Sequence, residues 1–377
     1  MSPIRNQTVK SSRRGIQRCA MATAVAGLIA ISACGGGGDS APSTAPPTAP
    51  PTTAAATTTT TEAITTTTIP GPLMPLTGLR GTDEAVANRP AVVAKIDNHP
   101  AARPQSGLIE ADIVYEENVE SLTRFAAVLH SQDSDPVGPL RSGRSQDVEL
   151  LANLNSPIFL WSGGNATVTR LINNSTMINM SPFIGSAASA FFRASDKGSP
   201  HNLYSRTAEI RNLAAEKGGG VPVAVFTYRA ADEAPAGVDA PGVKLSMDGG
   251  TNISWEWDAA SGTYLRRHGE KRHNAPSGNQ VNTHNVVVLF VSYRVSSADS
   301  RSPEAQSVGS GVAWVYSGGK LIVGTWNRPD AASGWGLVDE AGTPINLTPG
   351  RTWVELSREG KAAQVPAGAQ LADVAWP

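Results

Sequence analysis

The chain has 377 residues, two cysteines and a formal net charge of −1. Five of its 31 basic residues and none of its 32 acidic residues lie within residues 1–33, so the remainder has 26 basic and 32 acidic side chains, a net charge of −6. Nucleic-acid-binding proteins usually have an excess of basic residues, which this chain does not have. We therefore expect no nucleic-acid partner.

Residues 1–33 have the pattern of a secretion signal peptide. The apolar run from Ala20 to Ile31 follows a basic segment and has the length of a signal-peptide core, but it is too short to span a bilayer. Arg13 and Arg14 partly match a twin-arginine signal. Basic signal regions often contain such a pair by chance, so general secretion is favoured. We expect the protein to leave the cytoplasm.

A cysteine follows this apolar run, with the small residues Ser32 and Ala33 directly before Cys34. The order resembles a bacterial lipobox, which implies cleavage before Cys34 and attachment of lipid, palmitate included, to the thiol and the new amine. An ordinary signal peptide with a chance cysteine is the alternative. Because Cys19 leaves with the signal, the folded part would contain neither a disulfide nor a thiolate metal site. The lipid would then anchor the protein to a membrane.

Residues 34–72 are predicted to be a disordered linker. The stretch from Ala41 to Pro70 is nearly all Pro, Thr, Ala and Ser, with Glu62 as its only charge. Such a composition cannot bury a core and stays extended. Glycosylation of its threonines is left open.

Residues 73–217 are predicted to form an α/β layered domain, because apolar strand-like runs alternate with helical patterns. The expected strands are 91–96, 113–117, 124–130 and 157–161. The expected helices are 104–111, 145–154, 165–172 and 205–217, with Asn165 and Ser205 as N-caps of the last two.

Residues 218–377 have a different pattern, and Gly218 to Gly220 mark the expected boundary. No convincing helix is present, so we expect a mostly antiparallel β domain and an α+β fold class overall. The expected strands are 223–228, 243–247, 253–257, 264–267, 285–295, 311–316, 321–326 and 352–356.

The densest group of unusual polar residues lies in the first domain. Asp97 follows a predicted strand, and ligand sites of open α/β sheets lie at the carboxyl ends of strands. Arg141 and Arg144 are spaced i, i+3 near a predicted helix start, where guanidinium groups and free N–H groups suit phosphate. Asp97 could hold Mg²⁺ against that phosphate. The residues predicted to bind a ligand are Asp97, Asn98, His99, Arg103, Arg124, Arg141, Arg144 and His201.

Two other interpretations of this group stay open. The arginines could instead brace the fold through ion pairs, with the nearby carboxylates Asp112, Glu116, Glu117 and Asp147 as partners. His99 and His201 each adjoin a proline and could serve as a general base, although a hydrogen-bonded structural role is more common. The catalytic residues, if any, stay unassigned.

The β domain contains one further candidate. Trp255 and Trp257 alternate on a predicted strand and therefore share a face. Such a pair can stack on sugars, yet more often it fills a core.

At several of these segments the chain resembles the YerB-type lipoprotein family, whose two conserved domains have no known function. The specific strings are 97–115 and 138–144, and looser matches occur at 264–266, 285–288 and 350–353. The resemblance covers 73–356. It implies an extracytoplasmic lipoprotein with this two-part layout and no established reaction.

A more distant similarity connects the first domain with LytR-CpsA-Psr phosphotransferases. The shared order is a strand followed by Asp, then Thr-Arg before an apolar strand, then Arg-Ser-x-Arg, a helix and Gly-Gly. The resemblance implies magnesium-dependent transfer of glycopolymers at a membrane. The chain departs from that pattern by having Arg141-Ser142 where the family has an Arg-Asp pair, and by its lipid anchor.

The leading hypothesis is a lipid-anchored binding or accessory protein of the cell envelope, with an anion or phosphate site in the first domain. A non-enzymatic role is favoured, with no cofactor beyond Mg²⁺. Its expected partners are a cell-wall or other anionic envelope polymer, or envelope proteins. The alternatives are the phosphotransferase and a structural scaffold for envelope complexes.

Overall fold

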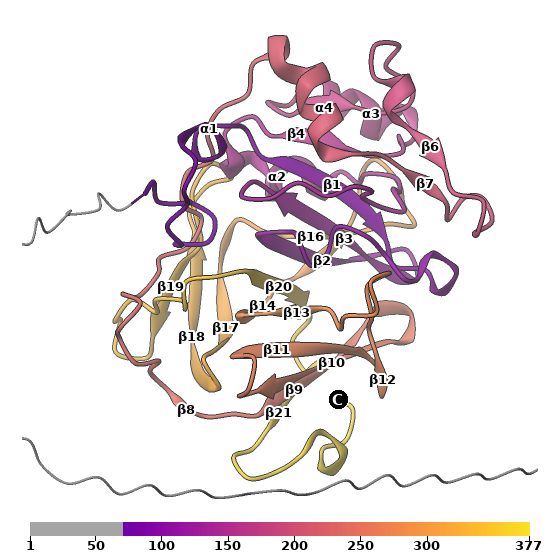
Figure 1. Cartoon of the computed structure of the whole chain (residues 1–377). Helices are drawn as coiled ribbons and strands as arrows, with labels where there is room; N and C mark the ends of the chain where they lie inside the picture. The colour runs from indigo at the N-terminus through magenta and orange to yellow at the C-terminus, as the bar shows by residue number, and fades with distance from the viewer. Residues whose placement is uncertain (1–70) are drawn as a thin grey trace, which may run out of the picture. The chain divides into compact units, whose positions relative to one another are not determined.

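The structure, a computed structural model, describes residues 71–377, and these belong to one compact unit (Figure 1). The predicted signal peptide, Cys34 and the predicted linker up to residue 70 lie outside the described residues. Within 71–377, no helix is both long and apolar enough to cross a membrane.

A large mixed sheet runs through the described part of the chain. It has 11 strands in the order β19-β18-β17-β14-β20-β2-β3-β1-β4-β5, with β8 paired to β18. Its strands are β1 Val92–Asp97, β2 Ile113–Val119, β3 Leu122–Leu129, β4 Ile158–Leu160, β5 Ile178–Met180, β8 Val238–Asp239, β14 Asn285–Phe290, β17 Gly309–Ser317, β18 Lys320–Arg328, β19 Gly336–Asp339 and β20 Thr352–Ser357.

The strands at the centre of this sheet are buried on both faces. Every residue of β1, β2, β14 and β20 is buried. Successive side chains of β1 enter opposite layers, with Val92, Ala94 and Ile96 in one apolar cluster and Val93 in the other. This two-sided burial explains the near-continuous apolar runs in the sequence.

A second sheet consists of antiparallel pairs. It has six strands, in the order β12-β11-β10-β9-β21 with β13 paired to β11. Trp255 and Tyr264 from this sheet share one apolar cluster with Val286 and Trp353 of the large sheet. The strands are β9 Gly242–Met247, β10 Thr251–Asp258, β11 Thr263–His268, β12 Lys271–Arg272, β13 Asn282–Thr283 and β21 Ala362–Val365.

Two small two-stranded sheets and short helices complete the described fold. The small sheets are β6 Phe192–Arg193 with β7 Leu203–Tyr204, and β15 Tyr293–Val295 with β16 Pro303–Ala305. The α-helices are α1 Glu84–Ala87, α2 Gln146–Leu150, α3 Ala166–Asn173 and α4 Thr207–Ala214. The 3₁₀ turns are η1 Pro100–Ala102, η2 Ala152–Leu154, η3 Ala188–Ala190, η4 Ala215–Lys217, η5 Asp248–Gly250 and η6 Leu371–Asp373.

Two helix predictions need correction. The helix expected over 104–111 is absent, because Gly107 adopts a φ of 93°, outside the helical region, and Ser106 forms an isolated bridge with Gly138. Ser205 does not cap α4, because its hydroxyl donates instead to the carbonyl of Ala190, and Arg206 occupies the N-cap position. Asn165 does cap α3, accepting from the backbone N–H of Val168 at 2.9 Å.

The two halves of the chain share the large sheet. The β2–β3 hairpin pairs through β2 with β20, in parallel, from Ile113 opposite Thr352 to Glu116 opposite Glu355 (Figure 1). Without β20 one edge of β2 would be an unpaired, apolar edge. The α+β class with a β-rich second half is confirmed. The boundary at residue 217 stays a prediction, and it falls within one compact unit.

Candidate functional site

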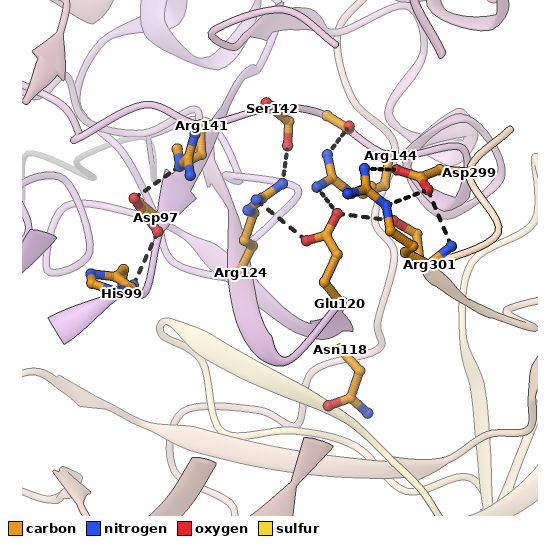
Figure 2. Close-up of polar contacts among 12 residues, drawn as sticks. Asp97, His99, Asn118, Glu120, Arg124, Arg141, Ser142, Arg144, Asp299 and Arg301 are labelled. Carbon is orange, nitrogen blue, oxygen red and sulfur yellow. Dashed lines mark hydrogen bonds and ion pairs between the residues drawn. The ribbon is translucent and has the colours of Figure 1, made fainter. Parts of the chain in front are cut away.

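Asp97 ends β1 and organises a compact polar cluster. Its side chain is 1% exposed. One carboxylate oxygen, Oδ2, accepts a hydrogen bond from Arg141 Nε at 3.1 Å, and Oδ1 accepts one from the backbone N–H of His99 at 3.0 Å (Figure 2). Oδ2 also accepts a hydrogen bond from His201 Nδ1 at 2.7 Å. Three hydrogen-bond donors therefore hold this carboxylate in place.

The cation expected at Asp97 has no cluster of ligands around it. Among residues 71–377, no group of three or more His, Cys, Asp or Glu side chains could hold a metal ion. The guanidinium of Arg141 already lies against the carboxylate of Asp97. The magnesium site stays a prediction.

The two histidines of this cluster stack on each other. The rings of His99 and His201 lie 4.1 Å apart between centroids and 13° from parallel. His99 Nδ1 accepts from the backbone N–H of Ala101 at 3.1 Å. The neutral ring of His99 must then carry its hydrogen on Nε2, which makes Nε2 a donor.

Arg124 and Arg144 converge on one carboxylate, that of Glu120. Glu120 lies in the β2–β3 turn, where its φ is 20°. Arg124 Nη2 lies 3.5 Å from Glu120 Oε2, Arg144 pairs with Glu120 Oε1, and Arg124 Nη1 donates to the carbonyl of Ser142 at 2.9 Å (Figure 2). Burial, and then the charge of Arg144, lower the pKa of Arg124 to about 10. Both arginines thus brace the fold, although through a carboxylate that was not among the expected partners.

Arg103 differs from these arginines because no carboxylate lies within ion-pair distance of it among the described residues. Its Nη2 donates to the carbonyl and to Oδ1 of Asn98, at 3.0 and 3.3 Å. Its Nε is buried and has no hydrogen-bond partner in the described part of the chain. Burial, and then the charge of Arg266, lower the pKa of Arg103 to about 10.

Arg103 lines a cleft of about 500 Å³ to which both halves of the chain contribute. The first half supplies the end of β1 with η1 and the β2–β3 turn, and the second half supplies the β9–β10 turn and the end of β11. No Asp or Glu lines the cleft. Its lining residues are Asn98, His99, Pro100, Arg103, Ser121, Leu122, Gly249, Gly250, Thr251, Asn252, His268 and Gly269.

Asn98 holds Arg103 in place rather than offering free groups of its own. Its Nδ2 donates to Glu116 at 3.2 Å and to Thr123 at 2.7 Å, while its Oδ1 accepts from Arg103 and from Gln105. The side chain is buried and its hydrogen-bonding capacity is used. Asn98 is therefore a positioning residue for Arg103.

A buried network lies behind the cleft, centred on Arg266 of β11. Arg266 Nη2 donates to Glu116 at 2.7 Å, and Nη1 donates to His273 Nδ1 at 2.7 Å. His273 Nε2 can then donate to Gln105 at 2.9 Å. Burial, and then the charge of Glu116, raise the pKa of Glu355 well above its usual range. The ion pair of Arg266 is with Glu116.

The candidate residues thus form three groups. Asp97, Arg141 and His201 are together, Arg124 and Arg144 meet at Glu120, and Arg103, Asn98 and His99 reach the cleft. The sequence did not single out four residues that lie in or behind the cleft, which are Asn252, Arg266, His268 and His273. In this region its one signal was the looser family match at 264–266. Trp255 is a core residue whose Nε1 donates to Glu355 at 2.8 Å.

We expect stability to fall on mild acidification, because buried histidines resist protonation in the folded state. Burial, then the charges of Arg211 and Arg89, lower the pKa of His130 to about 4. The unfolded chain protonates this histidine near pH 6.5, so unfolding takes up a proton between about pH 6.5 and 4. The free energy of unfolding should therefore drop on acidification through this window, by up to about 1.4 kcal/mol per pH unit for this group.

Urea denaturation of wild type and His130→Gln at pH 7.5, 6.5 and 5.5 checks this expectation. Wild type should lose stability more steeply than the variant. Equal slopes for both proteins would contradict the assignment to His130.

Comparisons with known proteins agree with this architecture. Residues 76–220 match a family model described as "Protein of unknown function (DUF3048) N-terminal domain", and residues 243–354 match the corresponding C-terminal domain. A protein of Bacillus subtilis (strain 168) described as "Putative lipoprotein YerB" is 29% identical over 306 residues, which are 78% of this chain and 88% of the relative. The crystal structure of YerB from B. subtilis matches with a TM-score of 0.68 and 24% identity, over 78% of this chain and 99% of that chain.

Proposed function

Because the chain belongs to the YerB-like family that carries both DUF3048 domains, we propose that it is a lipid-anchored accessory protein of the cell envelope that binds an anionic ligand in the cleft at Arg103. The relative's description as a lipoprotein supports the anchor. The guanidinium of Arg103, which has no ion-pair partner among the described residues, supports the proposed anionic ligand.

The lipid anchor is assigned to Cys34, on the lipobox-like order of Ser32, Ala33 and Cys34. Replacing Cys34 by alanine removes the only thiol near the expected cleavage site. We expect C34A to lose incorporation of labelled palmitate and to move from the membrane to the soluble extracytoplasmic fraction. Cys19→Ala is the matched control and should stay lipidated and membrane-bound. Unchanged labelling and fractionation of C34A would contradict the anchor.

The observation that carries the binding proposal is the electrostatic imbalance at Arg103. A partly buried guanidinium without a direct ion-pair partner is costly, and burial and Arg266 lower its pKa to about 10 although the charges of Glu116 and Asp97 oppose the shift. A bound anion would supply a directly paired negative charge and an acceptor for Nη1, which makes no hydrogen bond to the described residues. In contrast, Arg124 and Arg144 already pair with Glu120, and Arg141 pairs with Asp97. These ion pairs favour Arg103 over the other predicted arginines as the anchoring cation.

Substituting Arg103 by glutamine tests the proposal. The change keeps a polar side chain but removes the charge and the guanidinium fork, so we expect affinity for inorganic phosphate to fall by about 10- to 100-fold, the equivalent of about 1.4–2.7 kcal/mol. Isothermal titration calorimetry on residues 67–377, the whole of the compact unit to which the described residues belong, measures this directly.

The matched control is Arg170→Gln, which makes the same charge change on the exposed face of α3. It should bind phosphate like wild type. Equal affinity of wild type and R103Q, or no binding of phosphate to wild type at millimolar concentration, would overturn the proposal.

The phosphotransferase and scaffold alternatives stay predictions. Among the described contacts, the arginines that motivated the transferase similarity are engaged in ion pairs.

A further inference from the structure

Three side chains of the cleft have unused hydrogen-bond donors. Arg103 offers Nη1, which makes no hydrogen bond to the described residues and is not among the buried atoms, and His99 offers Nε2–H because its Nδ1 is occupied by Ala101. Asn252 uses its Oδ1 to accept from the hydroxyl of Ser246 at 3.1 Å, which leaves Nδ2 to donate. With no carboxylate in the lining, these donors select an anion.

These donors come from separate elements on two sides of the cleft. Arg103 and His99 flank η1, in the first half of the chain, and Asn252 belongs to β10. A planar carboxylate presents only two oxygens, whereas a phosphate group presents oxygens in tetrahedral directions. The arrangement therefore suits phosphate better than carboxylate.

The size and polarity of the cleft indicate what is attached to the phosphate. A volume of about 500 Å³ lies within the range of sites for whole small molecules and is far more than one phosphate fills. Leu122 and Pro100 are its main apolar lining, beside hydroxyls of Ser121 and Thr251 and glycine backbone. These walls suit a hydroxyl-rich group and offer little to a hydrocarbon chain.

The two walls of the cleft are fastened to each other. The backbone N–H of Asp248 donates to Asn118 Oδ1 at 2.9 Å. Gly249, with φ of 68°, packs so closely on the β2–β3 turn that a Cβ there would lie 1.7 Å from the carbonyl oxygen of Ser121. The donors are thus held in position before a ligand arrives, which lowers the entropic cost of binding.

We infer that the cleft recognises a phosphate ester of a sugar or polyol, the repeating chemistry of anionic envelope glycopolymers. This inference rests on the proposed anion site at Arg103 and specifies its ligand. The phosphate contacts Arg103, His99 and Asn252, and the polyol occupies the rest of the cleft.

Calorimetric titration of residues 67–377 with four probes tests the inference. The probes are glycerol 3-phosphate, inorganic phosphate, glycerate and glycerol. We expect glycerol 3-phosphate to bind at least about tenfold more tightly than inorganic phosphate or glycerate, and glycerol not to bind. Asn252→Asp should weaken glycerol 3-phosphate binding at least about tenfold through repulsion. Asn279→Asp, the same change at an exposed loop position, should not.

The outcomes separate this inference from the proposed function. If phosphate binding depends on Arg103 but glycerate or inorganic phosphate binds as tightly as the ester, the anion site at Arg103 stands and the proposed ligand class is wrong. Ester affinity unchanged in N252D also overturns the assignment. Failure of every anion to bind wild type overturns both.

Discussion

Replacing Arg266 by methionine is expected to destabilise the fold by about 3–5 kcal/mol, because it leaves the carboxylate of Glu116 buried without its partner. Both side chains are fully buried, and their atoms Nη2 and Oε2 lie 2.7 Å apart. The guanidinium also lies 5.3 Å from the ring of Phe125 and 5.1 Å from that of Trp353. Methionine fills a similar volume, so the loss of stability reflects the missing positive charge rather than a cavity. Urea denaturation followed by tryptophan fluorescence measures the effect.

The neighbouring Arg267 provides the matched control. It pairs at 2.7 Å with Glu256, but both side chains are partly exposed. Exposed pairs contribute about 0–1 kcal/mol, so R267M should cost no more than this. Adding Glu116→Gln to R266M should restore part of the stability, because it removes the unpaired charge. Equal losses for R266M and R267M would contradict the importance of the buried pair.

Ending the chain at residue 220 is expected to prevent the first half from folding stably. The cut removes β20, whose backbone pairs with Ile113 to Glu116 of β2. It also removes Trp353, which packs edge-on against Phe125 with centroids 5.2 Å apart. The remaining fragment would expose an apolar strand edge, a template for aggregation. Residues 67–220 should therefore aggregate or lack a cooperative melting transition.

Circular dichroism melts and size-exclusion chromatography compare this fragment with residues 67–377. The longer chain should be well dispersed and melt cooperatively. A fragment of 67–220 that is monodisperse and melts with a similar sharp transition would show that the shared sheet is dispensable for the first half.

The sequence predicted individual strands well where both faces are buried. The run expected over 91–96 is β1, and that expected over 113–117 lies within β2, because continuous apolar segments leave few alternatives. Helices were predicted less well near proline, as the absence of a helix over 104–111 shows. There Gly107 adopts a φ of 93°, outside the helical region, and Ser106 pairs with Gly138 instead.

The candidate site was predicted only in part. Residues at the end of β1 were expected to meet, and Asp97 does lie beside Arg141 and His201. The choice of ion-pair partners depends on the conformation of turns and on contacts between residues distant in sequence. The sequence pattern reveals neither. Glu120 lies in a tight turn, and Asn252 reaches the cleft only because the second sheet packs on the first half. Long-range pairing of this kind leaves no local periodicity to detect.

The central claim is that Arg103 anchors a phosphate group in the cleft between the β2–β3 and β9–β10 turns. A crystal structure of residues 67–377 with glycerol 3-phosphate tests it most directly. We expect density for the phosphate within hydrogen-bond distance of Arg103 Nη1, with His99 and Asn252 as further donors. Phosphate bound elsewhere while the cleft stays empty, or a carboxylate paired with Arg103, would contradict it.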